Sequence, residues 1–97
     1  MSDADPPDKT LLSGSFSFAR PTLFCARAHL YDDRLELTGW RLTGRYRRCI
    51  LLRRILQADV PSANCLLLWT ADGRVLRLQI DDARRWQQVI TRRLNEA

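Results

Sequence analysis

The sequence contains few of the residues from which enzyme active sites are usually built. It has a single histidine, His29, and it lacks a glycine-rich phosphate-binding loop, an H-E-x-x-H zinc motif and a G-x-S-x-G nucleophile motif. His29 lies in the middle of an expected β-strand, where no neighbouring residue orients it as a base, so a packing or surface position is favoured. The sequence therefore predicts neither a catalytic site nor a cofactor.

Cysteines and long apolar runs are also scarce. Cys25, Cys49 and Cys65 are odd in number and none is spaced as C-x-x-C, so free, buried thiols are expected in place of a disulfide framework or a metal site. The longest apolar run, residues 65–71, is too short to cross a bilayer, and residues 1–10 lack the basic and apolar regions of a signal peptide. These features predict a cytoplasmic protein.

Lysine is almost absent, whereas arginine is abundant. The net charge is +5, and fifteen arginines stand beside a single lysine. Residues 1–12 carry a charge of −2, so residues 13–97 carry +7 from fifteen arginines and eight acidic residues. Two interpretations stay open: the arginines favour an anionic partner, or arginine is the default surface cation of a GC-rich genome.

Alternating apolar and polar residues predict a β-rich domain after a short tail. Residues 1–10 are acidic and contain Pro6–Pro7, which predicts a disordered tail. Turn signals then separate seven expected strands, at residues 13–20, 22–31, 34–40, 43–52, 54–60, 65–70 and 74–80. The Asp72–Gly73 pair is the strongest hairpin signal, and Gly39 indicates a β-bulge before Trp40.

Within the second expected strand, side chains should alternate between two faces. The alternation assigns one face, the apolar one, to Phe24, Ala26, Ala28 and Leu30. In the neighbouring strand, Leu35 and Leu37 are expected to point inward.

After residue 80 the apolar period becomes that of a helix, over residues 82–94. At about 100° per residue, one arc of about 140° holds the apolar positions Ala83, Trp86, Val89, Ile90 and Leu94. The carboxylate of Asp81 or Asp82 is expected to cap the helix. A meander of seven antiparallel strands and one helix predicts a mainly β fold, a barrel or orthogonal sandwich, whose open end the helix closes with Trp86 as its plug.

Three stretches carry a resemblance to a known superfold. They are "RCILLRRI" at residues 48–55, "CLLLWTADGRVLRLQI" at residues 65–80, and "WQQVITRRL" at residues 86–94. With them the chain resembles the pleckstrin-homology (PH) superfold, especially its bacterial PH-like and GRAM-type members. The resemblance implies a single PH-like domain at residues 11–97 that acts as a non-catalytic interaction module.

The resemblance also implies a place for anion binding. In PH-like barrels the loops after the first and third strands lie together at the end away from the helix. In this chain those loops are expected to bring Arg20, Arg41 and Arg45 together, with Arg47 nearby, and such a cluster would be suited to bidentate contacts with phosphate. An ordinary solvated surface stays open as the alternative, because Arg45 and Arg47 alternate with Tyr46 and Arg48 along one strand.

Several partner classes follow from these patterns. The leading hypothesis is a module that docks on a protein partner or an anionic membrane surface, peripherally at the membrane. The alternative is a small nucleic-acid-binding protein, in which Trp40, Trp69, Tyr31 and Tyr46 would stack on bases. Self-association through edge strands also stays open, since such edges can pair across a dimer. An enzyme with a site around His29 is the last possibility, and it requires a carboxylate partner in a deep pocket.

Overall fold

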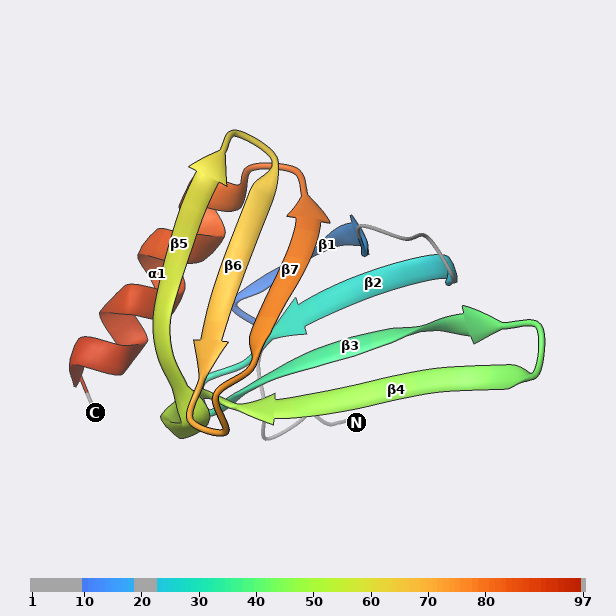
Figure 1. Ribbon diagram of the computed structural model, residues 1–97, viewed down its shortest axis with the longest axis horizontal. Helices are drawn as coiled ribbons and strands as arrows, with labels where there is room; N and C mark the ends of the chain where they lie inside the picture. The colour runs from blue at the N-terminus through green and yellow to red at the C-terminus, as the bar shows by residue number, and fades with distance from the viewer. Residues whose placement is uncertain (1–9, 19–22, 97) are drawn as a thin grey trace, which may run out of the picture.

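The chain forms an antiparallel sheet followed by a single helix (Figure 1). The computed structural model describes residues 10–18 and 23–96. The helix, α1, spans Ala83–Glu96. The strands are β1 (Leu12–Ser17), β2 (Phe24–Leu30), β3 (Arg34–Arg41), β4 (Gly44–Leu51), β5 (Ile55–Ser62), β6 (Cys65–Thr70) and β7 (Val75–Ile80), with a 3-10 turn, η1 (Leu52–Arg54), before β5. The predicted fold class, seven antiparallel strands and one C-terminal helix, is confirmed. The predicted acidic tail lies outside the described residues except for Thr10.

The strand β1 holds the two halves of the sheet together. The strand order is β4-β3-β2-β1-β7-β6-β5, so β4 and β5 are the edges. Residues Leu12 to Ser15 pair with β2, whereas Phe16 and Ser17 pair with β7. Because one short strand serves both halves, the sheet folds over itself, and in Figure 1 the strands β2–β4 cross β5–β7 at a steep angle. The core lies between these two halves.

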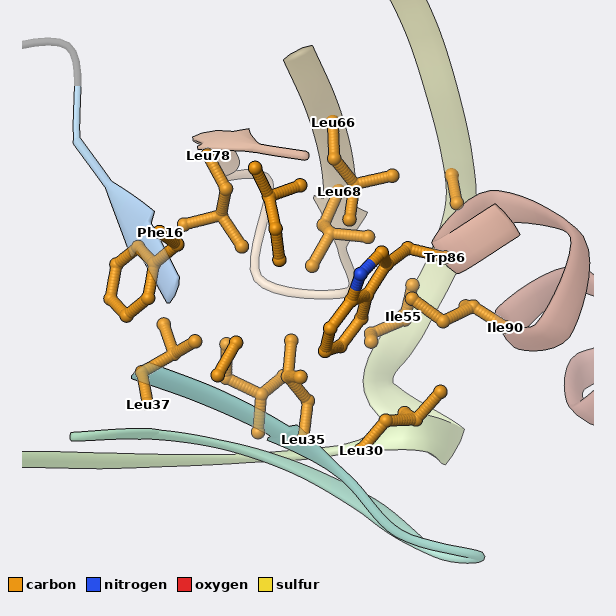
Figure 2. Close-up of a cluster of buried hydrophobic side chains, with 14 of the residues drawn as sticks. Phe16, Leu30, Leu35, Leu37, Ile55, Leu66, Leu68, Leu78, Trp86 and Ile90 are labelled. Carbon is orange, nitrogen blue, oxygen red and sulfur yellow. The ribbon is translucent and has the colours of Figure 1, made fainter. Parts of the chain in front are cut away.

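Trp86 fills the end of this core, as the helix pattern predicts. The residue is only 4% exposed, and Ala83 and Ile90 on the same side of α1 are fully buried. Figure 2 shows the indole pointing from α1 into the cluster of leucines that both halves of the sheet contribute. A Cβ on Gly14 would lie 3.6 Å from Cζ2 of the ring, so β1 passes close over the indole. The helix packs mainly on β5, and the Gln87 side chain donates to the Ala58 carbonyl at 3.0 Å.

The start of α1 differs from the prediction. Asp82 has a φ of 59°, and its backbone carbonyl accepts from the N–H groups of Arg85 at 3.0 Å and Trp86 at 3.4 Å. Within the described part of the chain, neither Asp81 nor Asp82 makes a side-chain hydrogen bond, so the expected carboxylate cap is wrong. A capping residue needs an extended backbone to aim its side chain at the first amides of the helix, and left-handed Asp82 lacks it.

A β-bulge lies where Gly39 predicts one, but its extra residue belongs to β2. Phe24 pairs with Trp40, and the next aligned pair, Arg27 with Thr38, is three residues later in β2 but only two residues earlier in β3. Cys25 and Ala26 therefore face Gly39 together. A Cβ on Gly39 would lie 3.3 Å from the Ala26 Cα, which explains why the smallest residue stands opposite the bulge.

The bulge overturns one expected core position. Phe24 was expected to share a face with Ala26, Ala28 and Leu30, yet it is 58% exposed while those three residues are buried. The extra residue in β2 shifts the inside–outside alternation by one position, so Phe24 lies on the opposite face. Leu35 and Leu37 of β3, which the bulge does not displace, are fully buried as predicted.

The cysteines differ from the prediction in their burial. All three are free thiols, but only Cys65 is buried, whereas Cys25 and Cys49 are exposed. Cys25 lies at the bulge with a φ of 52°, and Cys49 alternates outward beside the buried Ile50. Among residues 10–18 and 23–96, no group of three or more histidine, cysteine, aspartate or glutamate side chains is arranged to hold a metal ion.

Candidate anion-binding surface

The hairpin between β3 and β4 projects from the end of the sheet opposite α1 (Figure 1). We call its end, residues 40–45, the hairpin tip. Arg41 pairs with Gly44, so only Leu42 and Thr43 form the connection. Gly44 has a φ of 141°, a backbone conformation that residues with a side chain rarely adopt. This tight turn leaves the Leu42 side chain 93% exposed.

One row of side chains crosses the sheet directly behind the turn. Phe24 of β2 pairs with Trp40 of β3, and Trp40 pairs with Arg45 of β4. Directly paired residues of antiparallel strands share a face, so these three side chains lie side by side on the face turned away from the core, which we call the outer face. Phe24 and Trp40 are 58% and 53% exposed. The row therefore presents two aromatic side chains and one cation to solvent.

Arg41 lies on the other face of the hairpin. Its guanidinium carbon stands 4.7 Å from the centre of the Tyr46 ring, and Tyr46 in turn meets the ring of Phe18 edge-on at 6.2 Å. The cation–π contact holds Arg41 over Tyr46, which itself packs against the core. Arg41 and Arg45 thus lie on opposite faces of the hairpin tip, each within a few residues of exposed Leu42.

Arg47 is tied to an acidic neighbour. It pairs with Thr38 on the outer face, and its guanidinium donates to Glu36 Oε1 at 3.0 Å. Arg34 donates to the other oxygen of Glu36 at 2.8 Å. The hydrogen bond from Arg34 lowers the pKa of Glu36 and, with that from Arg47, outweighs the burial that would raise it. Glu36 therefore stays charged and offsets part of the Arg47 charge.

The four arginines that the sequence singles out are accordingly distributed as follows. Arg45 and Arg47 lie on the outer face, Arg41 lies on the opposite face, and Arg20 is outside the described residues. A further arginine joins the outer face: exposed Arg27 pairs with Thr38, which pairs with Arg47. Sequence reasoning missed Arg27 because only the register across three strands places it in the same row as Arg47, with Thr38 between them.

His29 does not have the surroundings of a catalytic base. It is partly buried, and within the described residues its only polar contact is a hydrogen bond of 3.2 Å between Nδ1 and the Ser13 hydroxyl. A carboxylate would be needed beside it to orient and activate the ring. The arrangement is that of a cross-strand pair, in which a hydroxyl and an imidazole satisfy each other on the surface of a sheet.

Membrane-spanning helices are not found among the residues that the structure describes: α1, the only α-helix there, is neither long nor apolar enough to cross a bilayer.

Comparison with known proteins identifies the fold. No family model and no curated protein matches the chain. Solved structures do match. The linker-DH/PH domains of p115-RhoGEF match over 94% of this chain with a TM-score of 0.70 and 16% sequence identity. An N-terminally truncated form of the same domains matches over 94% of this chain with a TM-score of 0.70 and 13% identity. A DH/PH fragment of PDZRHOGEF in complex with human RhoA matches over 97% of this chain with a TM-score of 0.70 and 11% identity.

These matches span 30%, 31% and 34% of the matched chains, which are larger fragments with more than one domain. At such low sequence identity the likeness concerns the fold alone. Seven antiparallel strands closed by a C-terminal helix are what this chain and the matched structures share, and the chain therefore has the PH-like fold.

Proposed function

We propose that this PH-like domain is a non-catalytic interaction module that docks peripherally on an anionic membrane surface through its hairpin tip. One observation carries the proposal: three exposed apolar side chains, Phe24, Trp40 and Leu42, lie at or next to the hairpin tip. Arg45 accompanies the two aromatic side chains on the outer face, and Arg41 lies on the opposite face of the same tip. Tryptophan is favoured at the level of lipid headgroups, leucine is favoured below it, and arginine binds phosphate with two parallel hydrogen bonds.

Charge and apolar contact are both needed for this docking. A basic residue near an anionic leaflet contributes about 1 kcal/mol, and apolar surface removed from water contributes about 25 cal/mol per Å². Two arginines alone give weak, salt-sensitive binding, and three apolar side chains alone do not distinguish anionic from neutral lipid. The combination at the hairpin tip supplies affinity and selectivity together.

The proposal includes a cytoplasmic location and a protein partner as the second partner class. One of the matched structures is a DH/PH fragment in complex with RhoA, which supports protein binding by a domain of this fold. A bacterial, GRAM-type relationship also belongs to the proposal, and it is supported by the stretches at residues 48–55, 65–80 and 86–94 that carry the resemblance.

Nucleic acid is the alternative, and a specific observation supports it. Phe24 and Trp40 on the outer face, next to Arg27 and Arg45, resemble the aromatic and basic platforms on which single-stranded bases stack. Leu42, however, is exposed at the turn and does not lie on the flat outer face. A platform for base stacking does not require an exposed leucine at the turn. The membrane is therefore the preferred partner.

The test is sedimentation with phosphatidylserine-containing vesicles and with neutral phosphatidylcholine vesicles. We expect anionic vesicles to carry the protein down and neutral ones to leave it in solution. Arg41→Glu combined with Arg45→Glu should weaken binding by at least about tenfold, because the loss of two favourable contacts is joined by repulsion. Leu42→Ser should also weaken binding without changing the net charge.

A matched control is available on α1. Arg84→Glu combined with Arg92→Glu makes the same change in net charge on exposed residues far from the hairpin tip, and it should leave vesicle binding nearly unchanged. Equal sedimentation with both lipids, or equal losses in the two double variants, would refute the proposal. Salt-sensitive binding of a single-stranded oligonucleotide, with no vesicle binding, would establish the alternative.

A further inference from the structure

We propose that the free edge of β4 binds an extended acidic segment of a partner protein as an additional strand. β4 stands at one end of the strand order, and Figure 1 shows no described element along most of its outer side. It pairs with β3 residue by residue from Gly44 to Leu51 without a bulge. A regular edge of this kind presents a row of backbone groups to which an extended segment can add.

The hairpin geometry determines which backbone groups of β4 point to the open side. Because only two residues separate Arg41 from Gly44, these two bond each other, and every second pair along the ladder does the same. At the far end the Leu52 N–H donates to the Asp33 carbonyl at 2.9 Å, which fits the same alternation. The residues whose N–H and C=O groups point away from β3 are therefore Arg45, Arg47, Cys49 and Leu51.

The other edge of the sheet is built differently. β5 has irregular register at both of its ends, between Ile55 and Gln57 and between Asp59 and Ser62. It also contains Pro61, which has no backbone N–H. Bulges and prolines are the usual means of preventing a further strand from adding to an edge. Of the two edges, β4 is thus the one able to accept a partner strand.

Charge selects the kind of strand that β4 can accept. The chain from Gly44 to Ala58 contains no acidic residue, and it contains five arginines: Arg45, Arg47, Arg48, Arg53 and Arg54. Within the described residues, only Arg47 of these has an ion-pair partner, Glu36. A second copy of β4 would bring arginine against arginine, whereas an acidic strand would satisfy them.

A groove lies beside the second half of β4, and one face of the added strand would be turned toward it. A cavity of about 350 Å³ opens there. Its lining includes Arg48, Ile50, Leu51, Arg54, Ala71 and Asp72. Asp72, the only acid among them, is already bonded to the Thr70 hydroxyl and paired with Arg74 at 3.7 Å. Side chains of a strand alternate between faces, so the fitting partner alternates acidic residues with small apolar ones.

The experiment uses a short capped peptide in which glutamate alternates with valine, and its lysine–valine counterpart. We expect the acidic peptide to bind and the basic one not to bind. Binding should slow hydrogen exchange at the amides of Arg45, Arg47 and Cys49, while those of Tyr46 and Arg48 are protected before the peptide is added. Protection confined to other regions, or no binding of the acidic peptide, would overturn the inference.

Two substitutions at Cys49 isolate the backbone contribution. Cys49→Pro removes an N–H that points to the open side and spares the hydrogen bonds to β3. It should therefore weaken binding of the acidic peptide by at least about tenfold. Cys49→Ala keeps the N–H and should bind like the unchanged protein. If Cys49→Pro retains its cooperative melting and binds as well as Cys49→Ala, strand addition at β4 is excluded.

A charge variant tests the same edge without proline. Arg48 lines the groove and lies away from the hairpin tip. Arg48→Glu should therefore weaken binding of the acidic peptide about tenfold and leave vesicle binding nearly unchanged. This inference does not depend on membrane docking: failure of the vesicle experiment leaves it intact, and failure of the peptide experiment leaves the hairpin tip intact. Concentration-dependent dimerisation in place of peptide binding would show that the edge takes a second copy, against the proposal.

Discussion

Glu36 is a nearly buried carboxylate that pairs with two arginines on the outer face of the sheet. Its side chain is 10% exposed, and its two carboxylate oxygens accept from Arg34 at 2.8 Å and from Arg47 at 3.0 Å. A buried carboxylate without such donors would be strongly destabilising. The two guanidinium groups offset this penalty, and in return Glu36 fixes the position of Arg47 beside Arg45 on the hairpin.

The state of Glu36 predicts a loss of stability in acid. Its folded pKa lies below the ordinary value of 4.5, so its stabilising effect is complete above that pH and is lost as the pH falls through the folded pKa. Glu36→Gln should lower the free energy of unfolding by about 1–3 kcal/mol at neutral pH and should flatten the dependence below pH 4.5. Urea unfolding at a series of pH values measures both effects.

Asp33→Asn is the matched control for that measurement. Asp33 accepts from the same Arg34 at 2.9 Å, but its side chain is 68% exposed. Exposed ion pairs contribute about 0–1 kcal/mol, so this variant should change stability little and should keep the acid dependence. Equal effects of the two variants would mean that burial of Glu36 is not what gives its ion pairs their strength.

At the scale of elements, α1 is an integral part of the core. Trp86 is 4% exposed and lies in the same cluster as the leucines of both sheet halves (Figure 2). Trp86→Ala should lower the free energy of unfolding by about 3–5 kcal/mol, which is a large share of the roughly 5–15 kcal/mol expected for a whole domain. Thermal or urea unfolding followed by circular dichroism measures the loss.

Trp40→Ala provides the comparison for Trp86. The same side chain is removed, but Trp40 is 53% exposed at the hairpin tip and leaves no buried cavity. The loss should stay below about 1 kcal/mol, within the range of surface substitutions, while vesicle binding falls. Cooperative unfolding of Trp86→Ala at nearly unchanged stability would contradict the role of α1 as the closing element of the sheet.

The elements were predictable from the sequence, whereas the faces of some residues were not. Strand and helix periods are local, so each of the seven strands and α1 shows its own pattern. The face of Phe24 depends on a bulge whose extra residue is in β2, while the signal for it, Gly39, is in β3. Likewise Arg27 shares a row with Arg47 only through the register of both strands with Thr38, which lies between them. Contacts between strands require the register, which no single strand specifies.

At the scale of the whole molecule, positive charge is spread widely and does not by itself locate a binding surface. The described part measures 42 × 38 × 26 Å, with the hairpin tip at one end and α1 at the other (Figure 1). Exposed arginines occur at both ends, Arg45 at the tip and Arg84 and Arg92 on α1. The tip differs because exposed apolar side chains accompany its cations. Net charge supplies long-range attraction to anionic partners, and local composition selects where contact occurs.

The same arginines determine whether the protein remains a monomer. An unprotected, regular edge such as β4 would otherwise pair with its copy, and Arg45 and Arg48 oppose this by like-charge repulsion. We expect the unchanged protein to sediment as a monomer at low salt, and Arg45→Thr combined with Arg48→Thr to form a concentration-dependent dimer. Arg84→Thr with Arg92→Thr on α1 loses the same charge but frees no strand edge, so it should stay monomeric. Dimerisation of both variants would assign the effect to net charge. A stable dimer of the unchanged protein would show that repulsion at β4 does not control assembly.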